Sequence, residues 1–334
     1  MRNKVTIQDI ADFTGVSKFA VSRALAGKTG VSEQTRSMII KAAGQLGYFK
    51  EPLSDLPGDL QDPEAMTWTG TVLVLFPNVR YQNKDSVYWG PVFEGISARL
   101  NQKGLTILTL TEPSGDSVFS LLNPQAIKGI LTVGSVSTAI LLEIKRLGIP
   151  TVMVDHLDPA FPCDCLFADN LSSMREMVAK LIQKGYKSYQ FVGNITDAHS
   201  YYERWLGFRS ALEDFGVELQ QWKPLIGPEL DQFETTFLEA IDGRELPDVF
   251  VCANDYYAIT VLDVLKKRHG GAVPASCAVT GFDNVYSDHP ILATVDVNKE
   301  LIGMRAVDQL LRRIVNPGSH YEKTLLQADV IFRD

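Results

Sequence analysis

Apolar residues recur at helical spacing in the first fifty positions, in three separate groups. These groups are Ile7, Ile10 and Ala11; Ala20, Val21, Ala24 and Leu25; and Met38, Ile39, Ala42 and Leu46. A hydroxyl residue that can accept hydrogen bonds from first-turn amides precedes each group, at Thr6, Ser17 and Ser32. The pattern predicts three short helices. Gly15 permits a tight reversal between the first two, as in a helix-turn-helix.

From Thr71 onward, short apolar runs rich in β-branched residues alternate with helix-length segments. The runs are TVLVLF, LTILTL, GILTV, PTVMVD, YQFVG, DVFVC and CAVTGFD. Strands separated by helical segments are typical of βαβ units and parallel sheets. Roughly 260 residues are too many for one doubly wound sheet and suit two. We therefore expect two α/β lobes with a ligand cleft at the carboxyl ends of their strands.

The charge of the chain is distributed unevenly. Its 334 residues are 45% hydrophobic, which suits two or three globular domains, and its formal net charge is −8. A negative chain is a poor partner for DNA, because DNA binding depends on Lys and Arg at the phosphates. Residues 1–50, however, hold eight basic and three acidic residues, a net charge of +5 that leaves −13 for the remainder. The first fifty residues therefore keep the charge that a DNA-binding segment needs.

Other classes of protein are disfavoured by what the sequence lacks. No apolar run has the length of a signal peptide or a membrane span, so we expect a soluble, cytoplasmic protein. Cys163 and Cys165 flank Asp164, but no second ligand pair lies nearby, which favours reduced thiols and no metal site. Nucleotide-binding, hydrolase-elbow and zinc-protease motifs are absent and the five histidines are dispersed. We therefore expect neither a cofactor nor an enzyme.

The second predicted helix, from about residue 18 to residue 26, carries the candidate DNA contacts. Arg23 can donate two hydrogen bonds to a guanine edge, and Phe19 can lie against a thymine methyl group. Ser17 and Ser22 suit phosphates, and Lys18 lies near the helix start, where a recognition helix meets base edges. The same pattern fits any small three-helix bundle with a solvated charged face. The pattern alone leaves these two interpretations equal.

The residues themselves favour the first interpretation. The segment from Thr6 to Tyr48, and above all the run GVSKFAVSRALAGKTGVSEQTR, closely resembles the DNA-binding headpiece of the LacI/GalR family of bacterial repressors. The resemblance implies base-reading residues at Lys18, Phe19 and Arg23, and backbone contacts at Thr6, Ser17 and Ser22. It implies an all-α three-helix headpiece followed by an α/β core of periplasmic-binding-protein type, with two lobes built on doubly wound parallel sheets.

The resemblance continues through the core in the blocks VYWGPVFEGI, GIPTVMVDH, ERWLGFRSAL, VCANDYYAITVLDVL and VTGFDN. The positions that face the effector in relatives fall on Tyr88, Trp89, Asp155, Arg204, Asn254 and Asp283. Their chemistry suits a polyhydroxylated ligand, because carboxylates accept from hydroxyls, a guanidinium donates and an aromatic face stacks. Each also has a simpler interpretation: strand-end polar residues cap helices, Arg204 forms an ion pair, and Trp89 is packed.

We expect three segments along the chain. Residues 1–50 form the headpiece, residues 51–69 an acidic linker, and residues 70–334 an effector-binding and dimerisation core. In the core, lobe 1 takes about 70–167 and 297–318, and lobe 2 about 168–296 and 319–334. The linker carries five acids and no base, with Asp55 and Pro57 where relatives have Arg and the leucine of a hinge helix. An irregular tether is therefore expected in place of that helix.

Together these features predict a ligand-responsive transcriptional regulator, a repressor of carbohydrate-utilisation genes that binds a pseudo-palindromic operator as a homodimer. The expected partners are operator DNA and a small effector, a sugar or sugar derivative, with no membrane. The alternative is a cytoplasmic sugar-binding protein or a sugar-modifying enzyme on the same two-lobed core. A binding protein has no use for a basic headpiece, and an enzyme needs an acid/base pair, for which Asp155 and Asp283 are the obvious residues.

Overall fold

The computed structural model describes residues 6–25, 28, 30–46, 48, 68–76, 86–111, 123–227 and 231–333. The acidic stretch 51–67 lies outside the described residues, and so does the expectation of an altered hinge. Contacts divide the chain into two compact units, which we call unit 1 (1–154, 158–165 and 303–322) and unit 2 (155–157, 166–302 and 323–334). The sequence predicts lobe boundaries at 167/168, 296/297 and 318/319. The units change at 154/155, 157/158, 165/166, 302/303 and 322/323.

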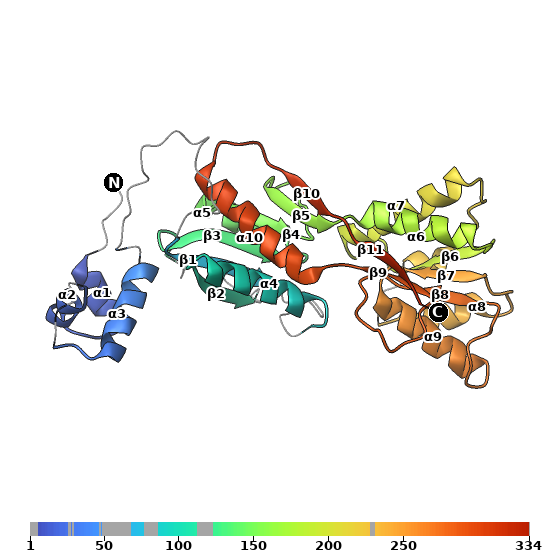
Figure 1. The fold of residues 1–334 in the computed structure, drawn as a ribbon, viewed down its shortest axis with the longest axis horizontal. Coiled ribbons are helices and arrows are strands. Elements are labelled where there is room, and N and C mark those ends of the chain that lie inside the picture. Colours follow the sequence, from blue (N-terminus) through green and yellow to red (C-terminus); the bar gives the residue numbers. More distant parts are fainter. Residues whose placement is uncertain are drawn as a thin grey trace. The chain divides into compact units, whose positions relative to one another are not determined.

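The headpiece consists of α1 (Ile7–Thr14), α2 (Lys18–Leu25) and α3 (Glu33–Gln45) (Figure 1). Their inward faces form one cluster of buried residues: Ile10, Ala11, Val21, Ala24, Ile39, Ala42 and Ala43. Thr6 caps α1 in a capping box with Asp9, and Gly15 ends it in the left-handed conformation at φ 70°. The predicted helix-turn-helix is confirmed, because the tight turn falls where the glycine permits it.

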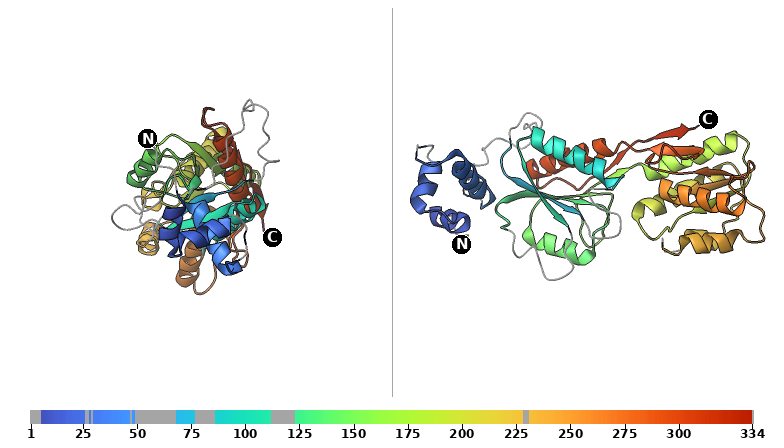
Figure 2. Two further views of the ribbon diagram at one scale, coloured as in Figure 1. Left: turned by 90° about the vertical axis from the view of Figure 1, so that its left-hand side faces the viewer. Right: turned by 90° about the horizontal axis from the view of Figure 1, so that it is seen from below.

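The first sheet has the strand order β10-β5-β4-β3-β1-β2. Its strands are β1 (Thr71–Phe76), β2 (Thr106–Thr111), β3 (Ile127–Val133), β4 (Thr151–Val154), β5 (Asp164–Ala168) and β10 (Lys323–Leu326). Helices α4 (Trp89–Gln102) and α10 (Lys299–Val315) lie on one face, and α5 (Thr138–Leu147) lies on the other (Figure 2, right). Every residue of β1 is buried, as expected for a parallel strand covered on both faces.

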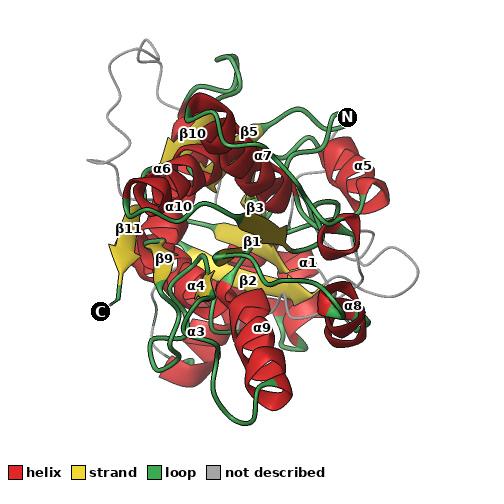
Figure 3. Cartoon of the chain, turned by 90° about the vertical axis from the view of Figure 1, so that its right-hand side faces the viewer, coloured by secondary structure: helices red, strands yellow, loops and turns green. Residues whose placement is uncertain are grey.

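The second sheet has the strand order β11-β9-β8-β7-β6. Its strands are β6 (Tyr189–Val192), β7 (Val249–Cys252), β8 (Ala278–Thr280), β9 (Ala293–Asp296) and β11 (Asp329–Phe332), of which β11 pairs antiparallel with β9. Helices α6 (Asn170–Gln183) and α7 (His199–Asp214) cover one face, and α8 (Phe233–Ile241) and α9 (Asp255–Arg268) the other (Figure 1). Figure 3 distinguishes the helices and strands by colour. The predicted fold class, a helical headpiece before two parallel α/β sheets, is confirmed.

The described part of the chain contains no helix long and apolar enough to cross a membrane. It also contains no group of three or more His, Cys, Asp and Glu side chains placed to hold a metal ion. All four cysteines are buried free thiols.

Helices α4 and α10 approach closely at Gly303. A Cβ built there would lie 2.1 Å from the carbonyl oxygen of Val92 and 2.7 Å from the amide nitrogen of Ile96, both of which are backbone atoms of α4. Backbone cannot move aside as a flexible side chain can. The contact therefore requires glycine at this position of α10.

We expect Gly303→Ala to lower the free energy of unfolding by roughly 1 to 3 kcal/mol, the usual cost of overpacking. Alanine normally favours a helix over glycine by about 1 kcal/mol, so the steric cost outweighs the propensity gain. Thermal unfolding measures the difference. Gly318→Ala is the matched control, because a Cβ at Gly318 meets nothing within 4 Å. Equal melting temperatures for the two variants would contradict the close helix contact.

Candidate DNA-binding and ligand-binding sites

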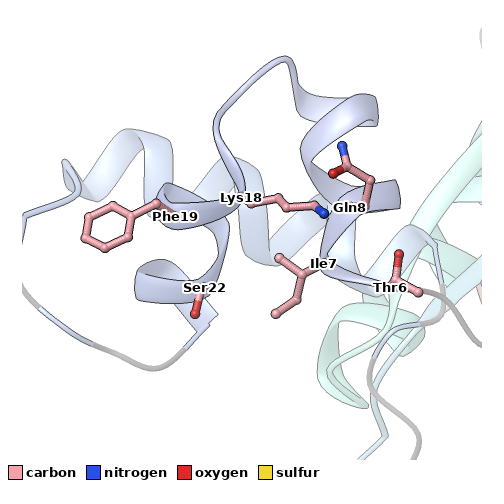
Figure 4. Close-up of a pocket in the computed structure, with 6 residues that line it drawn as sticks. All are labelled: Thr6, Ile7, Gln8, Lys18, Phe19 and Ser22. Carbon is pink, nitrogen blue, oxygen red and sulfur yellow. The ribbon is translucent and has the colours of Figure 1, made fainter.

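A shallow groove on the headpiece lies between the N-terminal ends of α1 and α2 (Figure 4). It is lined by Thr6, Ile7, Gln8, Lys18, Phe19 and Ser22, four of which are predicted DNA contacts. Figure 4 shows Lys18 extending toward α1 and the Phe19 ring extending away from it. The Phe19 side chain is 69% exposed, which excludes a core role for this ring. An exposed ring on this helix suits apolar contact with a base.

Arg23 lies on the same face of α2 as Phe19. Its guanidinium carbon is 5.3 Å from the centre of the Phe19 ring, within cation–π range. Its Nε lies 3.3 Å from where a Cβ on Gly30 would be, so the side chain lies against the segment between α2 and α3. The arginine fork is therefore supported on two sides. Base reading by Lys18, Phe19 and Arg23 stays a prediction.

Two of the predicted phosphate contacts are helix caps. The Thr6 hydroxyl donates to Asp9 Oδ2 at 2.7 Å and accepts from the Asp9 amide at 3.3 Å. Its side-chain hydrogen bond to Asp9 lowers the pKa of that carboxyl. The Ser17 hydroxyl accepts from the Ala20 amide at 3.2 Å. These hydroxyls fix the two helix starts that border the groove, and their contact with phosphate stays a prediction.

In unit 2, four of the six predicted effector residues lie just beyond strand ends or on the helix that follows β6. Asp155 follows β4, Asn254 follows β7, Asp283 follows β8, and Arg204 lies on α7. Among the residues that the structure describes, the non-glycine residues with positive φ are Asp155 at 55°, Asp283 at 96° and Asn284 at 49°. Such strained backbone gathers at functional sites, and two of these residues were predicted to bind ligand.

The Arg204 side chain is buried, with 2% of its surface exposed, and its guanidinium is fixed by hydrogen bonds. Its Nε donates to Asn170 Oδ1 at 2.9 Å, its Nη1 to the Ala253 carbonyl at 2.7 Å and its Nη2 to Asp283 Oδ1 at 3.0 Å. The Phe282 ring lies 3.7 Å from its guanidinium carbon. The simpler interpretation of Arg204 as an ion-pair partner therefore applies, and its partner is another predicted effector residue. The pair presents one fixed polar group at the strand ends.

Asn254 is the N-cap of α9. Its Oδ1 accepts from the Tyr257 amide at 3.0 Å, and its Nδ2 donates to the Tyr201 hydroxyl at 2.6 Å. Burial raises the pKa of Tyr201, so this hydroxyl keeps its proton at neutral pH. Sequence reasoning missed Tyr201. The available signal was its position three residues before Arg204, which places both side chains on one face of α7.

Burial strongly affects the charge of Asp155 in unit 2. Burial and the negative charge of Asp283 raise the pKa of this carboxyl, whereas Arg204 and a hydrogen bond from Ser200 lower it, and the net result is a pKa of about 7. The Ser200 hydroxyl donates to Asp155 Oδ2 at 3.3 Å. The carboxyl therefore changes its protonation near neutral pH, where a ligand hydroxyl would meet it as donor or as acceptor.

Two residues that the sequence did not single out hold the loop that carries Asp283. The buried Asp255 accepts from the Thr294 hydroxyl at 2.7 Å and from the Val285 amide at 2.8 Å. Arg333, near the end of the chain, donates to the Tyr286 carbonyl at 3.0 Å and to Asn284 Oδ1 at 2.7 Å. Asp255 could have been found from its position, because it directly follows the predicted residue Asn254 at the start of α9. Arg333 gave no signal, because its contacts lie more than forty residues away.

Tyr88 and Trp89 belong to unit 1. Their rings meet edge to face at 4.7 Å, and the Trp89 amide donates to the Ser86 hydroxyl at 2.8 Å, at the start of α4. Trp89 is 8% exposed, so the simpler interpretation of a packed tryptophan applies to it. The grouping of all six effector residues into one site stays a prediction.

Two family models match the chain. The one described as bacterial regulatory proteins of the lacI family matches residues 6–51, and the one described as a periplasmic binding protein-like domain matches residues 178–334. The first covers the whole headpiece. The second covers most of unit 2, from within α6 to the last residue.

Curated relatives span the chain almost end to end. The HTH-type transcriptional regulator CelR of Thermobifida fusca is 24% identical and covers 100% of this chain and 98% of its own. The regulator GntR of Pseudomonas aeruginosa is 28% identical, covering 92% and 89%. The repressor CytR of Escherichia coli K12 is 25% identical, covering 98% and 95%. All three are named as HTH-type transcriptional regulators or repressors.

Solved structures share the fold. A CelR–cellobiose complex superposes with a TM-score of 0.68 at 22% identity, covering 98% of this chain and 99% of that one. A lac repressor dimer bound to operator and an anti-inducer gives a TM-score of 0.64 at 19% identity, with 98% of both chains covered. The chain therefore carries a helix-turn-helix domain of the lacI family of bacterial regulatory proteins, followed by a periplasmic-binding-protein-like domain, and it is similar along nearly its whole length to HTH-type transcriptional regulators.

Proposed function

We propose that this regulator is a cytoplasmic repressor of carbohydrate-utilisation genes, which binds a pseudo-palindromic operator as a homodimer and responds to a small neutral polyhydroxylated effector. The observation that carries the proposal is the Arg204–Asp283 pair, buried at the strand ends of unit 2 beside strained backbone. Because Asp283 already neutralises Arg204, this pair offers donors and acceptors but little net charge. Such a group favours ligand hydroxyls over phosphate or carboxylate groups.

Known relatives support a sugar as the effector class. A CelR structure was solved with cellobiose, and a LacI-family regulator of Enterococcus faecium with ribose. A thermal-shift screen of neutral sugars, sugar phosphates, sugar acids and nucleosides tests the class, since a ligand that binds the folded state raises its melting temperature. A shift confined to anionic compounds would contradict a neutral effector.

DNA binding follows from the headpiece. Its net charge of +5 over residues 1–50 predicts affinity that falls steeply with salt, and its groove predicts sequence preference. Fluorescence anisotropy on the DNA upstream of the regulator's own gene, at several salt concentrations, measures both properties. A complex with no preference over unrelated DNA would contradict an operator-binding role.

We expect Arg23→Ala to weaken specific operator binding by roughly 1 to 3 kcal/mol and to relax the preference at one base pair of each half-site. The physical reason is the loss of a supported guanidinium that donates twice to one base edge. Anisotropy on matched and mismatched operators measures both effects. Arg175→Ala removes a positive charge outside the headpiece and serves as control, with no expected change. An equal loss on specific and unrelated DNA would assign Arg23 to phosphate instead.

We also propose that the core binds its ligand without turnover. Asp283 is committed to Arg204, and Asp155 is the remaining acid of the pair that the enzyme alternative requires. Proton NMR of the bound ligand over hours tests this proposal. Unchanged ligand signals are expected, and the appearance of product would establish the enzyme.

A further inference from the structure

Glu203 lies next to Arg204 on α7, but its carboxylate serves other partners. Its Oε1 is 2.7 Å from Lys323 Nζ and 3.1 Å from His199 Nε2, and its Oε2 accepts from Asn170 Nδ2 at 3.2 Å. Burial opposes ionisation, but hydrogen bonds from His199, Lys323 and Asn170 prevail and lower the pKa of Glu203 to about 2. The group is therefore a carboxylate at every physiological pH. As a pure acceptor it requires each of its three partners to donate.

Asn170 transmits this requirement to Arg204. Its amide is 1% exposed, and its Nδ2 also donates to the Ala168 carbonyl at 3.1 Å. Both partners of Nδ2 are acceptors, so Oδ1 has to face Arg204 Nε, from which it accepts at 2.9 Å. A reversed amide would set a donor against the arginine donor. The carboxylate therefore fixes the orientation of the amide, and the amide fixes the guanidinium.

Lys323 connects this chain of hydrogen bonds to a point where the polypeptide passes between units. Glu322 is the last residue of that part of unit 1, and Lys323 is the next residue, in unit 2. On the unit 1 side, the Glu322 amide donates to Asp164 Oδ1 at 2.9 Å. Asp164 is fully buried and receives two hydrogen bonds from Arg313, at 2.6 and 3.0 Å. Each side of the peptide bond 322–323 is thus fixed by a carboxylate of its own unit.

We propose that Glu203 is a positioning residue, which orients the Arg204 guanidinium through Asn170 and couples it through Lys323 to the chain crossing at 322–323. A change in the backbone at this crossing moves Lys323, redistributes the hydrogen bonds of Glu203 and alters the support of Arg204. Ligand contact at Arg204 acts on the crossing by the same route in reverse. The regulatory meaning of this coupling rests on the proposed function, whereas the hydrogen-bond link itself does not.

The link is tested without any ligand, by solvent exchange of the Arg204 Nε–H group in ¹⁵N NMR. The signal is assigned by its loss in Arg204→Lys. Asn170 donates to one carboxylate oxygen of Glu203 and Lys323 to the other, and Glu203→Gln keeps the size of the side chain but replaces one of these oxygens with an amide nitrogen, which cannot accept. We expect the exchange rate of this group to rise about tenfold, the effect of one charge-assisted hydrogen bond.

Glu213→Gln is the matched control, because Glu213 is an exposed acid on the same helix. It should leave the Arg204 exchange rate unchanged. The melting temperature is measured for each variant, so that a general loss of stability is separated from a local effect. An unchanged exchange rate in Glu203→Gln would overturn the positioning role.

The connection to the crossing is tested with two variants of Lys323. Lys323→Met should also raise the exchange rate of the Arg204 Nε–H group, whereas Lys323→Arg should keep it near the rate of the parent protein. In an Asn170→Ala background, Lys323→Met should add nothing, because the intermediate link is already lost. Asn170→Ser replaces Asn170→Ala if the alanine variant unfolds. A persistent effect of Lys323→Met in either background would show another route and overturn the coupling. Failure of the sugar screen described above is a separate result and leaves this measurement intact.

Discussion

Arg204→Met is expected to lower the free energy of unfolding by roughly 3 to 5 kcal/mol and to abolish the response to effector. Asp283 would lose its counter-charge while 7% exposed, and the Asn170 and Ala253 acceptors would lose their donor. Operator binding without effector should persist at temperatures where the protein stays folded, because the headpiece has its own core. Denaturation, anisotropy and thermal shift with the effector measure the three properties.

The double variant Arg204→Met with Asp283→Asn is the control for stability, because asparagine carries no charge and tolerates the positive φ of 96° at this position. It removes the stranded carboxylate together with the guanidinium, and replacing both members of a buried ion pair is often close to neutral. We expect most of the lost stability to return, while the effector response stays absent. If the double variant recovered the response, Arg204 and Asp283 would be structural residues, and the ligand site would lie elsewhere.

Asp155→Asn is expected to change the pH dependence of stability. The Asp155 carboxyl ionises at an ordinary pKa of 3.8 when unfolded and at about 7 when folded. Between these values the folded protein holds a proton that the unfolded chain has released, so this group lowers the stability progressively as pH rises from about 4 to 7. Asparagine does not titrate and tolerates the positive φ of this position. The variant should therefore gain roughly 2 to 4 kcal/mol over the parent at pH 8, and no such gain below pH 4.

Urea denaturation of both proteins between pH 4.5 and 8.5 measures this difference. Asp263→Asn, at an exposed position of α9, is the control and should leave the difference from the parent constant with pH. Parallel curves for Asp155→Asn and its parent would mean that Asp155 ionises normally in the folded protein. The same titration has a consequence for binding, because an effector that donates to Asp155 binds the ionised form and releases a proton near neutral pH.

Much of the fold could be predicted because its signals are local. The seven apolar runs correspond to strands β1 to β4 and β6 to β8, and the hydroxyl caps mark where α1 and α2 begin. Strand β5 was not predicted, because it begins with the buried Asp164, whose counter-charge Arg313 lies 149 residues later. Strands β10 and β11 were not predicted because they are partly exposed and their apolar runs, LL and VIF, are short. Apolar patterning does not reveal a buried charge or a half-exposed strand.

The candidate site divides in the same way. Asp155 and Asp283 could be named from the resemblance to the LacI/GalR family, and their strand-end positions suit a parallel sheet, which gathers its ligand contacts at those ends. The side chains that hold them could not, since Asn170 and Glu203 lie 33 residues apart and act through each other. Arg204 and Asp283 lie 79 residues apart in the sequence. Their pairing makes two predicted ligand contacts members of one ion pair. The acidic linker lies outside the described residues, and its altered hinge stays a prediction.

The contact between Phe19 and Arg23 has a consequence for anyone who redesigns operator preference. Schemes that reassign recognition residues one at a time treat each side chain as an independent reader of one base pair. Here the Phe19 ring, which is predicted to contact a base, lies 5.3 Å from the guanidinium of Arg23, which is also predicted to do so. A library that varies Phe19 alone is therefore expected to shift the Arg23 guanidinium as well, and new specificities for this headpiece are best selected with both positions randomised together.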